Sequence, residues 1–408
     1  MPLDRLSHAL ADHVTTLEEA GTAKGAEAVV TEVVPPRGDR GTRVHLRDAG
    51  EREFIRMNSN SYLGLSLHAE IIAAEAEAAE RFGAGPGAVR FISGTYAPHV
   101  ALERALAEFH GREEAMIFSS AYAAVVSVLV PLIDERTVVI SDELNHNCII
   151  NAMRLARPLE KKIYPHLDMA ALDATLETVA GRAERALVVT DGIFSMRGDH
   201  APLDEVMEIA LRHDQQFAEN VVVLVDDSHG VGAFGDTGRG TEEYTKAPPA
   251  DVLVGTLGKA FGVNGGYVTS AAPIIRFLRE TSPMYIYSNP ITVGEAAAAR
   301  AALKLLDGDR GRALLKHLRA LTARFEAGLE ERGFETIPGA HPVTPLVVRD
   351  TERTRALVAH LRENGILATG LTYPVVPRGD EEIRFQVNAD HTEADIDTVL
   401  SVLGKFAQ

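Results

Sequence analysis

The sequence contains only one cysteine, Cys148, among its 408 residues. No disulfide can form within the chain, which is consistent with a reducing cytoplasm. The sequence also lacks any run of about 18 uncharged apolar residues, and its first 20 residues carry four acidic side chains in place of an apolar core. We therefore expect a cytoplasmic protein with neither a membrane-spanning helix nor an export signal.

Basic residues are in the minority, because 41 lysines and arginines face 58 aspartates and glutamates, for a formal net charge of -17. Such an excess of negative charge repels nucleic-acid phosphates and anionic lipid headgroups. Hydrophobic residues make up 46% and charged residues 24% of the chain, which is typical of folded globular proteins. The composition predicts a protein that binds neither nucleic acid nor membrane, and the length predicts two or three domains.

The first 57 residues combine a short amphipathic start with Pro35, Pro36 and alternating charges, which predicts an irregular N-terminal extension. From residue 58 the pattern changes to seven short apolar runs separated by helix-length segments. This alternation is typical of an α/β fold whose mostly parallel sheet has helices on both faces. The predicted strands are Ala115–Phe118, Thr137–Ile140, Lys162–Tyr164, Ala186–Val189, Val221–Val225, Asp251–Val254 and Gly266–Val268.

Beyond Pro290 the sequence predicts two long helices, at 292–307 and 312–332, followed by alternating strands and helices up to residue 406. This pattern is typical of a small α+β domain. We therefore divide the chain into an extension (1–57), a large α/β domain (58–291) and a C-terminal α+β domain with its linking helix (292–408).

Several predicted strands end in polar or ionisable side chains. In a parallel α/β sheet, ligands bind at the carboxyl ends of the strands, so these clusters should meet at one edge. So many ionisable groups at one edge indicate a chemical function. The clusters are Ser119–Ser120, Ser141–Glu143, Thr190–Asp191, Asp226–His229 and Gly255–Lys259.

Of the eight lysines in the chain, only Lys259 lies between small and apolar neighbours directly after a predicted buried strand. Burial lowers the pKa of an amine and makes the amine a nucleophile. A phosphate-binding P-loop is excluded, since Leu253 and Ala260 stand where that motif requires a glycine and a hydroxyl residue. We expect Lys259 to be a catalytic lysine.

Asp226 follows the apolar run 221–225, and a carboxylate buried at a strand end needs a cationic partner. A protonated pyridinium nitrogen would serve, and His229 could hydrogen-bond the phenolic oxygen of such a cofactor. Both residues could instead be metal ligands, but the sequence has no His-Glu-x-x-His motif and no cysteine pair to complete a metal site. The segment 119–122 precedes a predicted helix whose N-terminal N–H groups could bind a phosphate.

A buried lysine, a carboxylate at a strand end and a phosphate-binding helix start are what pyridoxal phosphate requires. With these features in place, the sequence resembles the α-oxoamine synthases, which are fold type I pyridoxal-phosphate enzymes, from about residue 58 to its C-terminus. The segment Arg90–Thr95 is most similar to the glycine C-acetyltransferase branch, also called 2-amino-3-ketobutyrate CoA ligase. The other segments that carry the resemblance are Asn58–Leu65, Asp142–His146, Thr190–Met196, Asp226–Gly232, Gly255–Lys259, Tyr373–Gly379 and Ile383–Arg384.

The resemblance implies a fold type I transferase with a large, mostly parallel seven-stranded sheet domain and a smaller C-terminal α+β domain. It implies an acyltransferase that joins the Cα carbanion of a small α-amino acid, preferably glycine, to an acyl thioester of coenzyme A or acyl carrier protein. Thiol and usually CO2 leave, and an α-aminoketone results. An aminotransferase of the same fold would share Lys259 and Asp226, and a non-catalytic subunit of this fold would tend to lose the lysine.

The resemblance also implies the roles of individual residues in binding the cofactor ring. Lys259 would bind the cofactor covalently and later remove the α proton of the amino acid. Asp226 would keep the pyridine nitrogen protonated, and His146 would stack on the ring. His229 and Ser195 would contact the phenolate oxygen.

The phosphate and the substrate would be held by other segments. Arg384 would bind the substrate carboxylate, with Asn60 nearby, because a planar guanidinium can form two parallel hydrogen bonds with it. Ser288 and Asn289 correspond to a segment that reaches the active site of the partner subunit, which implies a homodimer with its active site at the subunit interface. The phosphate would be held by Ser120, Ala121, Tyr122 and Thr256.

The sequence departs from the family pattern at several positions. Arg197 stands where an aspartate is usual, and Asn147 and Cys148 replace the usual Ala-Ser after His146. Ala121, Ala124 and the pair Val263–Asn264 also differ from the common residues. None of these changes affects the lysine, the aspartate or the arginine, so we expect differences in the acyl pocket and in phosphate binding only.

Overall fold

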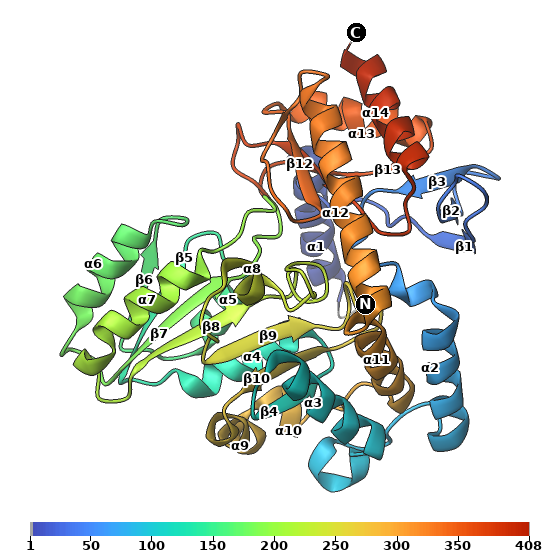
Figure 1. The fold of residues 1–408 in the computed structure, drawn as a ribbon. Coiled ribbons are helices and arrows are strands. Elements are labelled where there is room, and N and C mark those ends of the chain that lie inside the picture. The colour runs from blue at the N-terminus through green and yellow to red at the C-terminus, as the bar shows by residue number, and fades with distance from the viewer. Residues whose placement is uncertain (1–2, 408) are drawn as a thin grey trace.

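A seven-stranded sheet forms the centre of the structure, a computed structural model that describes residues 3–407 (Figure 1). The strands lie in the order β4-β10-β9-β8-β7-β5-β6, and β10 runs antiparallel to both of its neighbours while the remaining pairs are parallel. The predicted mostly parallel sheet is confirmed, with every predicted strand present. The strands are β4 (Glu114–Phe118), β5 (Thr137–Asp142), β6 (Glu160–Tyr164), β7 (Arg185–Asp191), β8 (Val221–Asp226), β9 (Val252–Thr256) and β10 (Gly266–Ser270).

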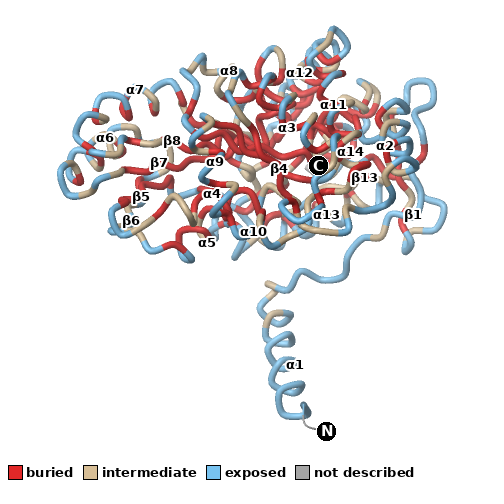
Figure 2. Tube along the Cα trace, turned by 90° about the horizontal axis from the view of Figure 1, so that it is seen from below, coloured by how far each residue is buried: buried red, intermediate tan, exposed pale blue. Residues whose placement is uncertain are grey.

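Helices cover both faces of this sheet, so that its strands form the buried band seen in Figure 2. Apolar residues of α4, α5, α9 and α10 pack on one face, and those of α6 and α7 pack on the other, where α3 also lies. Burial on both faces explains why the strands are nearly continuous apolar runs. The helices are α3 (Ala97–His110), α4 (Ala121–Leu132), α5 (Asn147–Leu155), α6 (Met169–Val179), α7 (Leu203–His213), α8 (Thr241–Thr245), α9 (Ala272–Thr281) and α10 (Pro283–Ile286).

Local sequence signals explain where individual helices begin and end. Helix α3 ends at Gly111, whose φ of 62° lies in the left-handed region that favours glycine. Helix α11 (Val293–Leu306) begins with a capping box, in which Thr292 Oγ1 accepts from the N–H of Glu295 at 3.0 Å and the Glu295 carboxylate accepts from the N–H of Thr292 at 2.6 Å. These contacts satisfy two N–H groups that have no partner within the helix.

The C-terminal part of the chain builds a second sheet in the order β11-β12-β15-β14, with α12, α13 and α14 around it. Its elements match the predicted alternation of strands and helices. No helix among residues 3–407 is long and apolar enough to cross a membrane. The elements are α12 (Asp309–Glu330), β11 (Glu335–Thr336), β12 (Val343–Val347), α13 (Thr351–Glu363), β13 (Ile366–Leu367), β14 (Thr369–Leu371), β15 (Glu382–Gln386) and α14 (Glu393–Ala407).

The prediction of an irregular N-terminal segment is wrong. After α1 (Asp4–Glu19), the strands β1 (Val30–Val34), β2 (Arg43–Leu46) and β3 (Glu53–Arg56) form an antiparallel sheet, and β3 pairs in parallel with β13. The strands are short, and β3 pairs with β13 near the opposite end of the chain. The local sequence pattern therefore could not predict these strands. Helix α2 (Ala69–Phe82) then leads into the large sheet.

Candidate active site

The carboxyl ends of three neighbouring strands meet at one pocket. The last residues of β7 and β8, Asp191 and Asp226, are paired across the sheet, and Lys259 follows the end of β9. The sequence predicted this convergence from the polar residues after each strand. The pocket is lined by Ala121, Tyr122, His146, Cys148, Asp191, Ile193, Ser195, Asp226, Ser228, His229 and Lys259.

The Lys259 amine makes no hydrogen bond or ion pair with any residue in the range 3–407. Burial lowers the pKa of this amine to about 8, although the charge of Asp226 opposes the shift. Roughly a tenth of the amine is therefore neutral at pH 7, compared with a very small fraction for a solvated lysine. A neutral, unpartnered amine inside a pocket can act as a nucleophile or a base.

Asp226 is held rigidly at the base of the pocket. Its Oδ1 accepts from the N–H and the hydroxyl of Ser228, at 3.1 and 2.6 Å, and its Oδ2 accepts from Cys148 Sγ at 3.6 Å. Burial and the charge of Asp226 raise the pKa of the Cys148 thiol, so the thiol remains a donor. Cys148 Sγ also lies 2.9 Å from His146 Nδ1, and it therefore connects the predicted stacking histidine to the predicted ring-nitrogen partner.

Asp191 is a pocket residue to which the sequence analysis assigned no role. Its Oδ2 accepts from the backbone N–H of His146 at 3.0 Å, whereas its Oδ1 is buried without a hydrogen-bond partner among the described residues. Burial and the neighbouring charge of Asp226 raise the pKa of Asp191 well above its ordinary value. Burial therefore favours the neutral form of the Asp191 side chain.

A chain of hydrogen bonds connects the pocket to Arg384 on β15. His229 Nδ1 lies 2.7 Å from the hydroxyl of Tyr62, which donates to Asn60 Oδ1 at 3.3 Å. Arg384 Nη2 donates to the same Asn60 oxygen at 3.0 Å. Burial lowers the pKa of His229 well below its ordinary value, and the charges of Lys259 and Arg384 act in the same direction, so this imidazole is neutral.

The N-terminus of α4 offers hydrogen-bond donors at the other end of the pocket. Ser120 caps the helix by accepting from the N–H of Ala123 at 3.1 Å. The N–H groups of Ala121 and Tyr122 have no acceptor within the helix, because they belong to its first turn. Gly266 on β10 brings the strand close to this turn, since a Cβ there would lie 2.3 Å from the nitrogen of Ala121. Free N–H groups at a helix start suit an anionic phosphate.

The residues present fit pyridoxal phosphate. A weakly basic, unpartnered lysine, a buried aspartate and a helix start with free donors supply the groups that this cofactor needs for its aldehyde, its ring nitrogen and its phosphate. Thr256 lies beside them, where its hydroxyl donates to the carbonyl of Gly265 at 3.2 Å and accepts from the N–H of Gly258 at 3.1 Å.

Six predicted site residues do not line this pocket. Asn60, Ser120, Thr256 and Arg384 adjoin it through the chain positions and hydrogen bonds described above, whereas Ser288 and Asn289 make no hydrogen bond to its lining among the described residues. Ser288 and Asn289 follow α10 in a segment whose preceding residue, Tyr287, is 81% exposed. The sequence analysis in turn missed Tyr62, Cys148 and Ser228 as neighbours of the site. Tyr62 lies within the Asn58–Leu65 motif and Ser228 within the Asp226–Gly232 motif, so their positions in these motifs could have indicated that they lie near the site.

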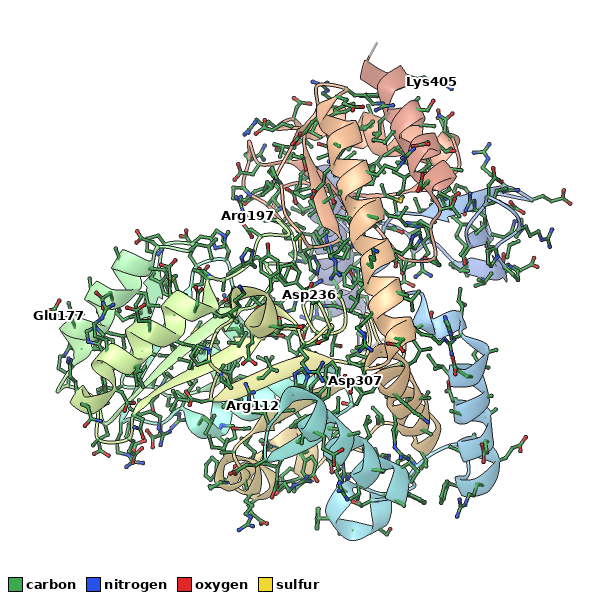
Figure 3. The ribbon with its side chains drawn as sticks, in the orientation of Figure 1. Arg112, Glu177, Arg197, Asp236, Asp307 and Lys405 are labelled. Carbon is green, nitrogen blue, oxygen red and sulfur yellow. The ribbon has the colours of Figure 1, made fainter. Side chains whose placement is uncertain are left out.

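Arg197, which replaces a usual aspartate of the family pattern, lies where the large sheet faces the C-terminal strands (Figure 3). Its Nε donates to Asp199 Oδ2 at 2.8 Å. Burial raises the pKa of the neighbouring Glu382 to about 7, and the charges of Arg197 and Arg384 oppose this shift. The arginine thus faces a buried carboxyl group on the same strand as Arg384.

His166 links the ends of β5 and β6 to the loop that follows β7. Its Nδ1 lies 3.0 Å from Asp142 Oδ1, and its Nε2 lies 3.2 Å from Asp199 Oδ2. Burial alone would lower the pKa of this imidazole, but its hydrogen bonds to the two carboxylates and their charges outweigh burial and raise the pKa to about 9.

We expect His166 to stabilise the protein in a pH-dependent manner. Because the pKa is raised from 6.5 to about 9 on folding, the stabilisation is complete below pH 6.5 and is lost as the pH rises through about 9. His166→Gln should therefore lower the free energy of unfolding by about 2 kcal/mol at pH 6 and by much less at pH 10. Denaturant unfolding at both pH values measures this. A loss that is equal at both values, or equal to that of His13→Gln at an exposed position of α1, would contradict the assignment.

Comparisons with known proteins give a consistent result. A family model described as aminotransferase class I and II matches residues 52–403. The 8-amino-7-oxononanoate synthase of Geobacter sulfurreducens is 36% identical over 404 residues, which cover 99% of both chains. The mitochondrial 2-amino-3-ketobutyrate coenzyme A ligase of Homo sapiens is 37% identical over 398 residues, which cover 97% of this chain and 90% of that protein. The structure of serine palmitoyltransferase from Sphingomonas wittichii matches with a TM-score of 0.87 and 26% identity, over 99% of this chain and 97% of that one.

Proposed function

Because the chain belongs to the aminotransferase class I and II family, and within it to the pyridoxal-phosphate-dependent α-oxoamine synthases, we propose that it condenses glycine with a short-chain acyl thioester of coenzyme A. The chain is an enzyme of the acyltransferase type, and pyridoxal phosphate is its cofactor. The single observation that carries the proposal is the pocket in which the unpartnered amine of Lys259 lies near the charged carboxylate of Asp226.

When bound, pyridoxal phosphate supplies an electron sink that stabilises negative charge on Cα of the amino acid. The residues of this chain hold it and move the protons. Lys259 Nζ would bind its aldehyde carbon and later take the proton from Cα, because the low pKa of Lys259 makes the neutral amine available. Asp226 would hold the proton on the ring nitrogen, and His229 and Ser195 would contact the phenolate oxygen.

Other side chains orient the cofactor and the substrate. His146 would stack on the ring, and Cys148 contacts both His146 and Asp226. The N–H groups of Ala121 and Tyr122, together with Thr256 and the cap residue Ser120, would hold the phosphate. Arg384 binds the substrate carboxylate, and Asn60 keeps the guanidinium in position through the hydrogen bond described above.

The proposed reaction is an acyl transfer followed by decarboxylation. Cα loses its proton and forms a bond to the acyl carbon, whose bond to sulfur breaks, so that the free thiol leaves. The carboxylate is then released as CO2, and Cα is protonated again to give an α-aminoketone. Arg384 would orient the amino acid through its carboxylate and so influence which bond of Cα breaks in each step.

We also propose that the enzyme is a homodimer. Ser288 and Asn289 do not line the pocket of their own chain, and they follow a strongly exposed tyrosine. In this proposal they contact the phosphate held by the other protomer, so that each active site is completed at the subunit interface.

The function is tested by combining amino acids with acyl thioesters on the purified, cofactor-loaded enzyme. Free thiol is measured with a chromogenic reagent and the organic product by mass spectrometry. We expect thiol release with glycine and a short acyl-CoA, and none when either substrate is omitted. Response to a larger amino acid but not to glycine would overturn the glycine preference. Amino-group transfer to a 2-oxo acid without thiol release would replace the proposal with an aminotransferase.

Arg384→Lys should raise the KM for the amino acid by about 10- to 100-fold, with a smaller change in kcat. A lysine keeps the charge but cannot form two parallel hydrogen bonds with a carboxylate, and a lost charge-assisted hydrogen bond costs about 1.5 to 3 kcal/mol. Steady-state kinetics with varied amino acid measure the effect. Arg324→Lys, on the exposed surface of α12, is the control and should change neither constant. An unchanged KM in Arg384→Lys would show that another residue binds the carboxylate.

A further inference from the structure

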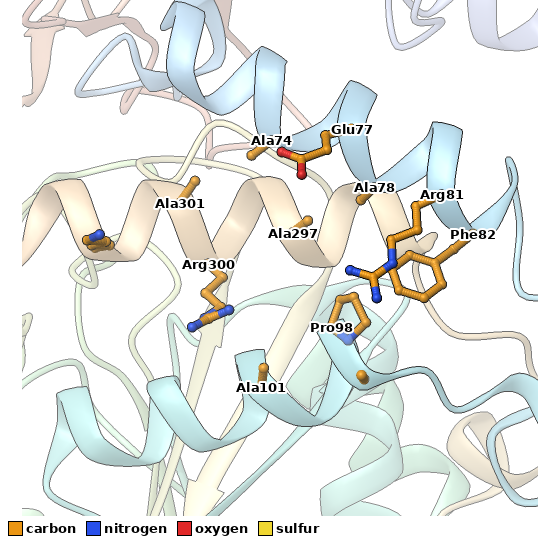
Figure 4. Close-up of a pocket in the computed structure, with 12 residues that line it drawn as sticks. Ala74, Glu77, Ala78, Arg81, Phe82, Pro98, Ala101, Ala297, Arg300 and Ala301 are labelled. Atoms are coloured by element: carbon orange, nitrogen blue, oxygen red, sulfur yellow. The ribbon is translucent and has the colours of Figure 1, made fainter.

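Two features of the structure have no part in the proposed function. One is a groove of about 510 Å³ between α2, α3 and α11, which is lined by alanines of all three helices (Figure 4) and shares no lining residue with the candidate active site. The other is Arg197, which lies two residues after Ser195 on the pocket wall and beside Glu382 of β15. Only Arg197 borders the site, and it stands where an aspartate is usual in the family.

Glu382 lies on the face of β15 that carries Arg384. Side chains alternate along a strand, so residues 382 and 384 point to one side, whereas Ile383 points to the other side, into the hydrophobic core. Glu382 is 5% exposed, and its Oε1 has no hydrogen-bond partner among residues 3–407. A buried oxygen without a partner is costly, because it has lost water and gained no donor in exchange. The Glu382 carboxyl group is therefore ready to accept from a donor that turns towards it.

Arg197 has the donors that Glu382 lacks. Its Nε donates to Asp199 Oδ2 at 2.8 Å, but its two terminal Nη groups make no hydrogen bond or ion pair with the residues that the structure describes. The Arg197 side chain is 44% exposed, so its end has room to turn. A planar guanidinium can hold one carboxylate through Nε and offer the remaining donors to a second.

The charges around Glu382 decide how well Arg384 can bind a substrate. Burial raises the pKa of Glu382 to about 7, the charges of Arg197 and Arg384 lower this pKa, and those of Asp199 and Asp380 raise it. A substrate carboxylate on Arg384 brings a further negative charge beside Glu382. Two carboxylates then share one guanidinium, and their like charges repel. A second cation on Glu382 removes this repulsion.

We propose that Arg197 is a positioning residue that acts through Glu382: its free Nη groups pair with the Glu382 carboxylate when the substrate carboxylate binds Arg384, so that Glu382 does not compete for the Arg384 guanidinium. The inference rests on the proposed function, because it takes Arg384 as the carboxylate-binding residue. It also explains the departure from the family pattern. An aspartate at position 197 would add a third carboxylate beside Asp199 and Glu382.

A suppressor experiment on the cofactor-loaded enzyme tests the inference. Arg197→Gln should raise the KM for the amino acid about 5- to 10-fold with a smaller change in kcat, which is at the lower end of typical couplings between two sites. Arg197→Lys keeps the charge and should leave KM nearly unchanged. Glu382→Gln by itself should also change KM little, because it removes the competing charge together with its partner.

The decisive variant carries both Arg197→Gln and Glu382→Gln. Its KM should return close to the wild-type value, because no carboxylate is left at position 382 to compete for Arg384. Loss of the contact between Arg197 and Asp199 would not be repaired by a change at position 382, so the rescue separates positioning from a structural role. A double variant with a KM as high as that of Arg197→Gln, or an unchanged KM in Arg197→Gln, would overturn the inference. Arg349→Gln, which removes an exposed arginine paired with Glu335, is the control and should change neither constant.

A second measurement distinguishes this inference from the proposed function. The cofactor absorbance of the same variants is titrated with amino acid alone, so that no acyl thioester is needed, and the apparent dissociation constants should follow the same order as the KM values. This order in an enzyme that releases no thiol would support the role of Arg197 while the proposed reaction fails. A weakened Arg384→Lys together with a wild-type Arg197→Gln would overturn the inference and leave the proposed function intact.

Discussion

Lys259→Ala is expected to lower the rate of thiol release by at least about 1000-fold. The substitution removes the amine that binds the cofactor aldehyde and the base that takes the Cα proton, and a positioned base alone contributes about 100- to 10,000-fold. The variant should still fold, because the Lys259 amine makes no hydrogen bond or ion pair among the described residues that the substitution would break. Lys316→Ala, an exposed position of α12, is the matched control and should retain full activity.

The same lysine gives a chemical and a pH-dependent readout. Borohydride reduction of the wild-type holoenzyme, followed by peptide mapping, should find the cofactor on the peptide that contains Lys259. The rate at which cofactor-free protein takes up pyridoxal phosphate should rise with pH around a midpoint of about 8, because only the neutral amine attacks the aldehyde. Attachment at another lysine, or a midpoint near that of a solvated lysine, would contradict the assignment.

Asp226→Asn is expected to reduce turnover by about 100- to 1000-fold. An uncharged amide cannot hold the proton on the ring nitrogen, and the loss of one partner from a buried charge pair costs about 3 to 5 kcal/mol. The visible absorbance of the bound cofactor should change at the same time, because its ring loses the proton. Asp226→Glu, which keeps the charge, should recover part of the activity.

Asp227 offers a matched control for Asp226. It is adjacent in sequence and also buried, but its carboxylate accepts from the N–H and hydroxyl of Thr241, both at 2.7 Å, and it does not line the pocket. Burial raises the pKa of Asp227 to about 7, so a neutral side chain is already tolerated there. Asp227→Asn should leave the cofactor spectrum unchanged. Equal spectral changes in both variants would mean that Asp226 acts only through the fold.

The sequence predicted the central sheet well because each of its strands is buried on both faces. Burial requires nearly continuous apolar runs, such as 221–225, and these are visible without any knowledge of partners. The prediction for segment 30–56 was wrong because its strands are short and not buried as continuous apolar runs, and because β3 pairs with β13 near the other end of the chain. A pairing of this kind leaves no periodic signal within either strand.

The residues of the candidate site could be predicted from the sequence, but the contacts between them could not. Lys259, Asp226, His229, His146 and Ser195 were predicted from residues directly after strands and from motifs, and the parallel sheet places them all at one pocket. The contacts between them were not predictable. The raised pKa of Asp191 depends on burial and on the proximity of Asp191 and Asp226 across the sheet, and a linear pattern does not contain these distances.

The amino-acid sequence by itself determined the order of strands and helices in the large unit, the reactive lysine and the family, because these depend on local patterns of polarity and on short motifs. Only the tertiary structure decided that Tyr62 and Asn60 connect His229 to Arg384, that Cys148 bridges His146 and Asp226, and that α1 has no surface of its own chain to cover it. These features depend on contacts between segments far apart in the chain. Such contacts exist only after the backbone has brought the segments together.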